Sequence, residues 1–295
     1  MSAVALAKPT PRASATSTWR GLIARALIYL LIVGGSVFFV VPFLWMATSS
    51  IKAPGDIFIQ PPKYLPYLQF QPRWQNYVDA WNALPFGYFL MNSLLVTVST
   101  TLATTFTSCV VAFGFARLRF RYRDLLFVVV LSTMMLPSQV TLIPLFILFK
   151  ELGWINTLKP LIVPTIFGGA FYIFLLRQFY LTLPMELDEA ARLDGCSSLG
   201  ILWRIIGPLS VPAIATVALF SFIAQWNDFL APLIYLNDLD KMTIAVGLQF
   251  FKGQEASDWN LLMAAATGAV LPIIVVFFFT QKLFIQGIAL TGLKG

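Results

Sequence analysis

The sequence predicts an all-α membrane protein with six transmembrane helices and both termini in the cytoplasm. Hydrophobic residues make up 58% of the 295 residues and charged residues only 11%, whereas a soluble domain has about 25% charged residues. A helix needs about 20 mainly apolar residues to cross the bilayer core. Apolar runs of that length cover residues 26–47, 88–115, 125–149, 158–180, 209–236 and 261–284.

The basic residues predict the orientation of the chain. An even number of spans places both termini on one side, and Lys and Arg are enriched in cytoplasmic segments. With both termini inside, the residues left outside are Lys52, Lys63, Arg73, Lys150, Lys159, Lys241 and Lys252, so 13 of the 20 basic residues lie inside. The net charge of +7 is therefore a topology signal, and a nucleic-acid partner is a poor explanation of it.

Three segments flank the predicted core of five helices at residues 87–285. Residues 1–22 are rich in Ala, Ser, Thr and Pro and contain no acid. We predict a disordered cytoplasmic tail there, because the next apolar run is longer than the roughly 7–15-residue core of a signal peptide. Residues 23–86 hold the first transmembrane helix and a proline-rich outer loop, which packing rather than a regular ladder would order. Residues 286–295 form a cytoplasmic C-terminal tail.

Polar residues and prolines within the core suggest helix contacts or a pathway. The second span carries a run of hydroxyl side chains from Asn92 to Ser108. Such side chains let helices approach closely and bond across their interface, so contact between helices is the simpler interpretation and contact with a solute the alternative. Pro137 and Pro144 interrupt the third span and predict a kink, which is tolerated at membrane depth where the helix lines protein or water.

A charged segment at residues 181–208, between the fourth and fifth spans, is too polar to enter lipid. Its charged residues include Glu186, Asp188, Glu189, Arg192, Asp194 and Arg204. Asp, Lys or Arg costs about 2.5–3.5 kcal/mol at the centre of a bilayer. We therefore predict a cytoplasmic elbow that serves a contact outside the membrane.

The first helix of this elbow is predicted to run from a cap at Thr182 to about Asp194. Asp188 and Arg192 are spaced to pair at i and i+4 on its polar face. Small residues at Ala190 and Ala191 would allow a groove on another protein to approach closely. A simple connector on the membrane surface is the alternative, but it does not account for the small residues.

Gly195 is predicted to end this helix in a left-handed turn. Ser197 or Ser198 can then cap a second helix, and Pro208 can stop it. The result would be two short helices joined at a glycine.

The elbow also resembles the signature loop of permease subunits of ATP-binding cassette (ABC) importers. The family pattern, EAA-x3-G-x9-I-x-L-P, is matched at Glu189-Ala190-Ala191, Gly195, Ile205 and Pro208. Gly207 replaces the usual Leu, and we expect this to loosen the second helix without affecting the first. The strings FLMNSLLVT in the second span and WNDFLAPL in the fifth are similar to the smaller permease of sugar, polyol or glycerol-phosphate importers.

The resemblance implies the six-helix fold of a type I ABC importer permease in a prokaryotic plasma (inner) membrane. It implies that an ATPase subunit contacts Glu189, Ala190, Ala191, Arg192, Asp194 and Gly195. The implied partners are a second permease, two ATP-binding cassette ATPase subunits and an extracytoplasmic solute-binding protein, besides membrane lipid. ATP and Mg would be bound by the ATPase subunits, and this chain would hold no cofactor or metal.

For a carbohydrate solute, five further residues are candidates for contact with the pathway: Asn92, Gln139, Trp226, Asn227 and Asp228. Sugar hydroxyls need paired donors and acceptors, and an aromatic face can stack on a sugar ring. Asp228 in an apolar run is a functional hypothesis by default, although it could be hydrated at the outer boundary of the membrane.

Two other classes of protein fit the sequence less well. An ion-coupled secondary transporter would show inverted repeats and ionisable groups near the midplane, and neither is evident. A polytopic enzyme acting on lipid-linked substrates is disfavoured because the chain contains no His and no paired carboxylates within the spans. The sequence also has no G-x-x-x-x-G-K-[ST] phosphate loop, so we predict no catalytic residues and no ATP hydrolysis by this chain alone.

Overall fold

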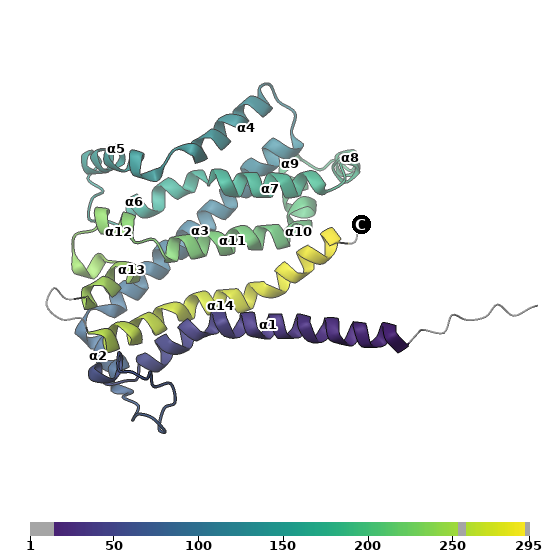
Figure 1. Ribbon diagram of the computed structural model, residues 1–295. Helices are drawn as coiled ribbons and strands as arrows, with labels where there is room; N and C mark the ends of the chain where they lie inside the picture. The colour runs from purple at the N-terminus through teal and green to yellow at the C-terminus, as the bar shows by residue number, and fades with distance from the viewer. Residues whose placement is uncertain (1–14, 253–257, 293–295) are drawn as a thin grey trace, which may run out of the picture.

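The computed structural model describes residues 15–252 and 258–292, and long helices dominate it (Figure 1). Within those residues there is no strand, only one isolated bridge between Pro66 and Phe70. The structure thus agrees with the predicted all-α class.

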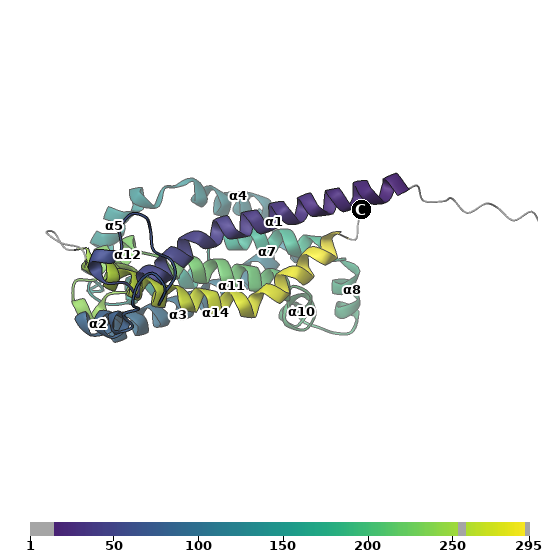
Figure 2. The same cartoon turned by 60° about the horizontal axis from the view of Figure 1, so that its bottom comes forward.

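Within the described residues, four spans are long and apolar enough to cross a membrane as single units. They lie in α1 (Ala15–Ser49), in α3 (Phe86–Arg117), in α6 (Lys159–Ile162) with α7 (Ala170–Thr182), and in α14 (Trp259–Gly292). They correspond to the first, second, fourth and sixth predicted runs. The helices α1 and α14 pack on each other and form the lower edge of Figure 1, and Figure 2 shows that they diverge toward the end that holds α8.

Two bent helix pairs are further candidate spans. The first matches the predicted run at 125–149, and the second joins the second elbow helix to the first part of the predicted run at 209–236. The segments Arg123–Met135 and Gln139–Glu151, which contain α4 (Arg123–Ser132) and α5 (Ser138–Glu151), meet at 96°. The break lies at Pro137, where the kink was predicted, and Leu136 is extended as expected for a residue before proline. The segments Ser198–Leu209 and Val211–Trp226 (α11) meet at 84°. Counting each pair as one span gives up to six.

The helix α3 forms the centre of the fold. It packs most closely on α7 and α11, and α11 also packs on α14. Apolar side chains form one buried cluster around the start of α3, with Phe86 and Phe89, and another around its end, with Cys109 and Ala112. The second cluster includes Ala191 of the elbow, so the elbow packs on the membrane helices.

Short helices gather at the two ends of the long ones (Figures 1 and 2). One end holds α2 (Gln75–Ala83), α12 (Leu230–Tyr235) and α13 (Ile244–Gly247). The other end holds α8 (Glu186–Leu193), α9 (Ser198–Ile201) and α10 (Gly207–Leu209). The elbow therefore lies opposite α2, which is part of the predicted outer loop.

Side chains bonded to the backbone hold this outer loop. The Nδ2 atom of Asn76 donates to the carbonyl oxygens of Ser50 (2.9 Å) and Lys52 (2.8 Å). Asn260 of α14 in turn donates to Oδ1 of Asn76 (3.2 Å). These bonds tie α2 and α14 to the end of α1, and they confirm that packing rather than a ladder orders the loop.

The boundaries of both predicted tails need correction. Residues 1–14 and 293–295 lie outside the described part of the chain. Residues 15–22, predicted as part of a disordered tail, are the start of α1, and no proline lies between Pro11 and Pro42 to prevent a helix there. Residues 286–292, predicted as the beginning of the C-terminal tail, continue α14.

Candidate functional site

The elbow at residues 181–208 comprises the end of α7, the helix α8, a turn and the helix α9, at one end of the molecule (Figure 2). The predicted N-cap at Thr182 is wrong. Thr182 is the last residue of α7, and its hydroxyl donates to the carbonyl oxygen of Phe179 (2.7 Å). The helix α8 begins only at Glu186, after Pro184. Three acids in its first turn, Glu186, Asp188 and Glu189, complement the positive end of the helix dipole.

One face of α8 is buried and the other is open. Asp188 and Ala191 are buried, whereas Glu189, Ala190 and Arg192 are exposed. The i, i+4, i+7, i+8 spacing of Leu183, Leu187, Ala190 and Ala191 predicts one apolar face for this helix. That prediction is wrong for Ala190, which lies on the open side. Leu193 at the end of α8 is 90% exposed, which is unusual for a leucine next to charged residues. The open face combines charges, a small residue and one large apolar side chain.

Gly195 makes the predicted left-handed turn, with a φ of 79°. The amide of Gly195 donates to the carbonyl oxygen of Arg192 (3.0 Å) and the amide of Cys196 to that of Ala191 (2.9 Å). A Cβ atom at Gly195 would have nothing within 4 Å. The backbone conformation, and not lack of space, is therefore the reason for a glycine here.

The second half of the elbow begins and ends close to the predicted residues. The Oγ atom of Ser197 accepts a hydrogen bond from the amide of Gly200 (3.2 Å) and caps α9. The helical segment Ser198–Leu209 ends one residue after Pro208, the predicted stop. The direction then changes by 84° at Ser210, before α11.

Gly207, the one departure from the signature, follows a π-helical turn at Leu202–Ile206. Its amide donates to the carbonyl oxygen of Leu202, and a Cβ atom at this position would lie 2.9 Å from that oxygen. The glycine thus lets the chain pass closely over the π turn.

Arg117, the last residue of α3, joins three helices at the elbow. Its Nη2 atom donates to the carbonyl oxygens of Tyr180 (2.6 Å) and Leu183 (2.9 Å) at the end of α7. Its Nη1 atom lies 3.7 Å from Oδ2 of Asp188, and the two side chains are 0% and 2% exposed. Because the last carbonyls of a helix have no partner within it, the guanidinium caps α7 while it pairs with α8.

Asp188 is therefore paired differently from the prediction. Its ion-pair partner is Arg117 and not Arg192, because the rotation of α8 that buries Ala191 also turns Asp188 toward α3. Burial raises the pKa of Asp188, and the charges of Arg117 and Arg192 oppose this shift without cancelling it.

Sequence reasoning missed Arg117 and Leu193 as site residues. Arg117 was counted only among the 13 basic residues that predict the topology, in a cluster with Arg119, Arg121 and Arg123. Its partner Asp188 is distant in the sequence. Leu193 lies inside the signature at one of the positions that the pattern leaves open. Its apolar character among charged neighbours was the available signal.

The five pathway candidates lie in different surroundings. Asn92 on α3 is half-buried, and its Nδ2 atom donates to the carbonyl oxygens of Asp240 (2.8 Å) and Met242 (3.1 Å). Gln139 is exposed in the first turn of α5, just after the break at Pro137. Asn92 thus anchors a connecting segment, and Gln139 stands on an open surface.

The remaining three candidates are consecutive at the end of α11. Trp226 is 4% exposed, and its Nε1 atom donates to the carbonyl oxygen of Ala269 in α14 (3.0 Å). Asn227 is exposed and donates to the carbonyl oxygen of Ile223 (2.8 Å). Asp228 accepts from the amide of Ala231 (3.3 Å) at the start of α12. The ring of Trp226 is covered, whereas Asn227 presents a polar surface.

Several hydroxyl groups of α3 serve contacts with other segments, while those of Ser99 and Thr100 bond to the backbone of α3 itself. Thr104 and Thr107 donate to the carbonyl oxygens of Thr165 (3.2 Å) and Ile166 (2.7 Å) in the turn before α7. Ser93 accepts from the amide of Ile244 in α13 (2.8 Å). These bonds support the interpretation of the hydroxyl run as helix contacts.

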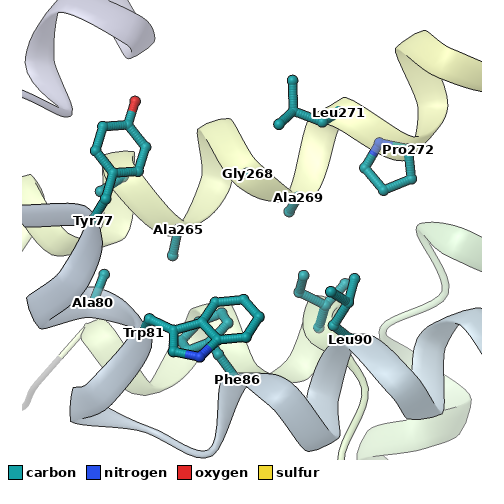
Figure 3. Close-up of a pocket in the computed structure, with 12 residues that line it drawn as sticks. Tyr77, Ala80, Trp81, Phe86, Leu90, Ala265, Gly268, Ala269, Leu271 and Pro272 are labelled. Carbon is teal, nitrogen blue, oxygen red and sulfur yellow. The ribbon is translucent and has the colours of Figure 1, made fainter.

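A cavity of ≈ 320 Å³ lies between α2, α3 and α14. Trp81 and Phe86 line one side of it, and Ala265 and Ala269 line the other (Figure 3). The hydroxyl of Tyr77 on its rim is already bonded to Ser50 (2.7 Å). Specific polar ligands need several well-placed polar groups, so this apolar cavity does not suit a sugar. None of the five pathway candidates lines it.

Comparisons with known proteins agree on one family. A family model described as "binding-protein-dependent transport system inner membrane component" matches residues 105–290. The probable ABC transporter permease protein YurM of Bacillus subtilis (strain 168) is 38% identical over 259 residues, which cover 86% of this chain and 83% of that protein. The arabinooligosaccharides transport system permease protein AraQ of the same strain is 32% identical over 278 residues, covering 92% and 96%.

A solved structure has the same fold. It is a bacterial ABC transporter involved in the import of the acidic polysaccharide alginate, and the matched chain has a TM-score of 0.75 and 22% identity. The match covers 93% of this chain and 100% of that one.

Proposed function

Because this chain belongs to the family of binding-protein-dependent transport system inner membrane components, the permeases of ABC importers, we propose that it forms half of a solute pathway in an ATP-driven importer. The transported solute is a carbohydrate or a related polar compound. Support for this class comes from relatives such as the arabinooligosaccharide permease.

The observation that carries the proposal is the open face of α8, presented at one end of the helical bundle. Glu189, Ala190, Arg192 and Asp194 are exposed there and are proposed to contact a cytoplasmic ATPase subunit. Ala191 and Gly195 contribute indirectly, through packing on the core and through the turn. Leu193 adds a large exposed apolar side chain to this face.

The remaining partners follow from the same proposal. Two ATP-binding cassette subunits bind ATP and Mg and supply the energy, since this chain has no phosphate loop. A second permease completes the pathway, and an extracytoplasmic binding protein delivers the solute. The chain lies in a prokaryotic plasma membrane with both termini in the cytoplasm, an orientation supported by the excess of basic residues on that side.

Among the pathway candidates, we propose Gln139 and Asn227 for solute contact because both are exposed, with Asp228 next to Asn227. Asn92 and Trp226 are proposed to hold the pathway wall, because they are half-buried and buried and bond to distant segments of this chain.

The experiment that tests the proposal is reconstitution from separate parts. The chain is expressed with and without the second permease and the ATPase subunits encoded beside it, and each preparation is placed in liposomes. The proposal expects retention of the ATPase by the permease pair, and uptake of labelled maltose or arabinose oligosaccharides only with ATP and the binding protein. Uptake by this chain alone, driven by an ion gradient, would instead establish a secondary transporter.

A further inference from the structure

We propose that Arg117 is a positioning residue that transmits movement of α8 to α3 and α7 during ATP-driven transport. This inference rests on the proposed function, in which α8 is the contact for the ATPase. It adds a role to a residue outside the signature loop.

The helix α8 has few other attachments to the membrane helices. It is not among the elements that pack closely on another helix, and in Figure 1 it stands at the very end of the bundle. Ala191 is its one residue within the buried core cluster. Turns at Pro184 and Gly195 bound α8 on both sides. Without a further attachment, α8 could rotate about these turns while the membrane helices stayed in place.

The Arg117 guanidinium provides that attachment in a rigid form. It is planar and presents its N–H donors in a fixed fork, and here the fork reaches α7 and α8 at once. Besides the bonds to Tyr180 and Leu183, its Nη1 atom contacts the sulfur of Met185 (2.7 Å) and the carbonyl oxygen of Pro184 (3.5 Å). The group therefore holds the end of α7, the connecting turn and the first turn of α8.

The charges at this position reinforce the geometry. The C-terminal end of α7 carries the negative end of its helix dipole, and Asp188 adds a negative side chain. The cation of Arg117 lies between them, away from solvent, where screening by salt is weak. A lysine could supply the charge but not the fork, so we expect Arg117→Lys to hold one helix at a time.

A displacement of α8 would travel inward along α3. Arg117 ends α3, which is the central helix of the fold and packs on α7 and α11. A second bond, from Nε of Arg177 on α7 to the carbonyl oxygen of Phe115 (3.3 Å), fixes α7 to α3 one turn earlier. We therefore expect α3, α7 and α8 to move together as one rigid body.

The test measures the distance between α8 and α3 by electron paramagnetic resonance. Spin labels are placed at Glu186→Cys and Leu102→Cys, both exposed positions, after Cys196→Ser removes the half-buried native thiol. The complete complex with its ATPase subunits is measured without nucleotide and with ATP plus vanadate. The test variants are Arg117→Met, Arg117→Lys and Asp188→Asn. The matched control is Arg121→Met, at an exposed arginine four residues after Arg117.

We expect one narrow distance distribution in the native complex and in Arg121→Met, unchanged by nucleotide. In Arg117→Met and Asp188→Asn the distribution should broaden and shift when ATP is added, with Arg117→Lys in between. If Arg117→Met does not fold, Asp188→Asn decides, since it keeps the bonds of Arg117 to α7. Distributions identical to the native one in these variants would overturn the inference. Failure of the native chain to retain the ATPase would instead contradict the proposed function.

Discussion

Asp188 and Glu189 are adjacent in α8 and face opposite surroundings. Asp188 is 1% exposed and is paired with Arg117, whereas Glu189 is exposed on the open face. Because an α-helix turns by about 100° per residue, two neighbouring acids can belong to different contacts. One acid holds the helix on its own protein, and the other is available to a partner.

Replacement of Glu189 should weaken docking of the ATPase without harming the fold. An interface hot spot contributes about 2 kcal/mol or more, so Glu189→Ala is expected to raise the Kd roughly thirtyfold. The Kd is measured by titrating labelled ATPase subunit onto the permease pair in nanodiscs. Glu186→Ala, at an exposed acid of the same helix outside the signature, should change little. Equal losses in both variants would point to a general effect of charge.

Replacement of Asp188 should stabilise the protein at neutral pH. The pKa of Asp188 is raised even in the presence of Arg117 and Arg192, with Glu189 adding to the rise and burial as the main cause. A carboxyl group with a raised folded-state pKa stabilises the fold when protonated, and this contribution is lost as the pH rises through that pKa. Asp188→Asn removes the buried charge permanently, so its midpoint of thermal unfolding should exceed that of the native chain at pH 7.

The same difference should shrink as the pH falls toward the ordinary Asp range near about 4, because the native carboxyl then becomes neutral too. Unfolding is followed in detergent by size-exclusion chromatography after heating. A lower midpoint for Asp188→Asn at pH 7 would show that the ion pair stabilises the fold more than burial costs. Arg117→Met is the contrasting variant and should lower the midpoint, because it leaves the buried Asp188 without a counter-ion and also removes the bonds to Tyr180 and Leu183. In Asp188→Asn, Arg117 keeps those two bonds.

The turn at Gly195 should depend on glycine for its backbone alone. A residue with a Cβ atom in the left-handed region costs about 1–2 kcal/mol, and no neighbouring atom would oppose the Cβ itself. We expect Gly195→Ala to lower the thermal midpoint and weaken ATPase retention. Gly114→Ala is the control, because Gly114 lies within α3 with nothing within 4 Å, and an alanine there should be neutral or stabilising.

The packing of α13 on α3 should fail when a methyl group is added. A Cβ atom at Gly247 would overlap the ring of Phe89, a buried core residue. Overpacking of this kind costs about 1–3 kcal/mol, so Gly247→Ala should lower the unfolding midpoint. Gly268→Ala on α14, where a Cβ atom meets nothing within 4 Å, should not. A native midpoint for Gly247→Ala would show that α13 can shift without cost.

Labelling from one side of the membrane tests the orientation. Single cysteines at Tyr67, in the proposed outer loop, and at Leu199, in the elbow, both lie at exposed positions. In intact cells that also carry Cys196→Ser, a membrane-impermeant maleimide should modify Tyr67→Cys and spare Leu199→Cys. The reverse pattern would contradict an inward-facing elbow.

The sequence predicted most of the helical segments and one of the two bends. The predicted apolar runs match the four single spans and the pair formed by α4 and α5, and Pro137 marked the break within that pair. Pro208 located the end of the second elbow helix to within one residue, but the 84° bend at Ser210 was not predicted, because the direction of α11 depends on its packing against α3 and α14.

Local signals in the elbow were more informative than pairings across the fold. Gly195 adopts a left-handed backbone conformation, and Ser197 bonds to an amide only three residues away, so the turn and the cap could be predicted from the local sequence. The partner of Asp188 could not, because Arg192 is the nearest cation along the helix and Arg117 approaches only when α3 and α8 are packed. In the sequence, nothing distinguishes Arg117 from the neighbouring Arg119, Arg121 and Arg123.

The measurement that tests the central claim most directly is ATP hydrolysis stimulated by the solute-loaded binding protein, in the complete reconstituted complex. The native elbow is compared with Glu189→Ala and Gly195→Pro, after confirming that both variants still assemble with the second permease. Coupling through α8 predicts stimulated hydrolysis in the native complex and its loss in both variants. Native rates in both would contradict that role and leave the elbow as a connector on the membrane surface.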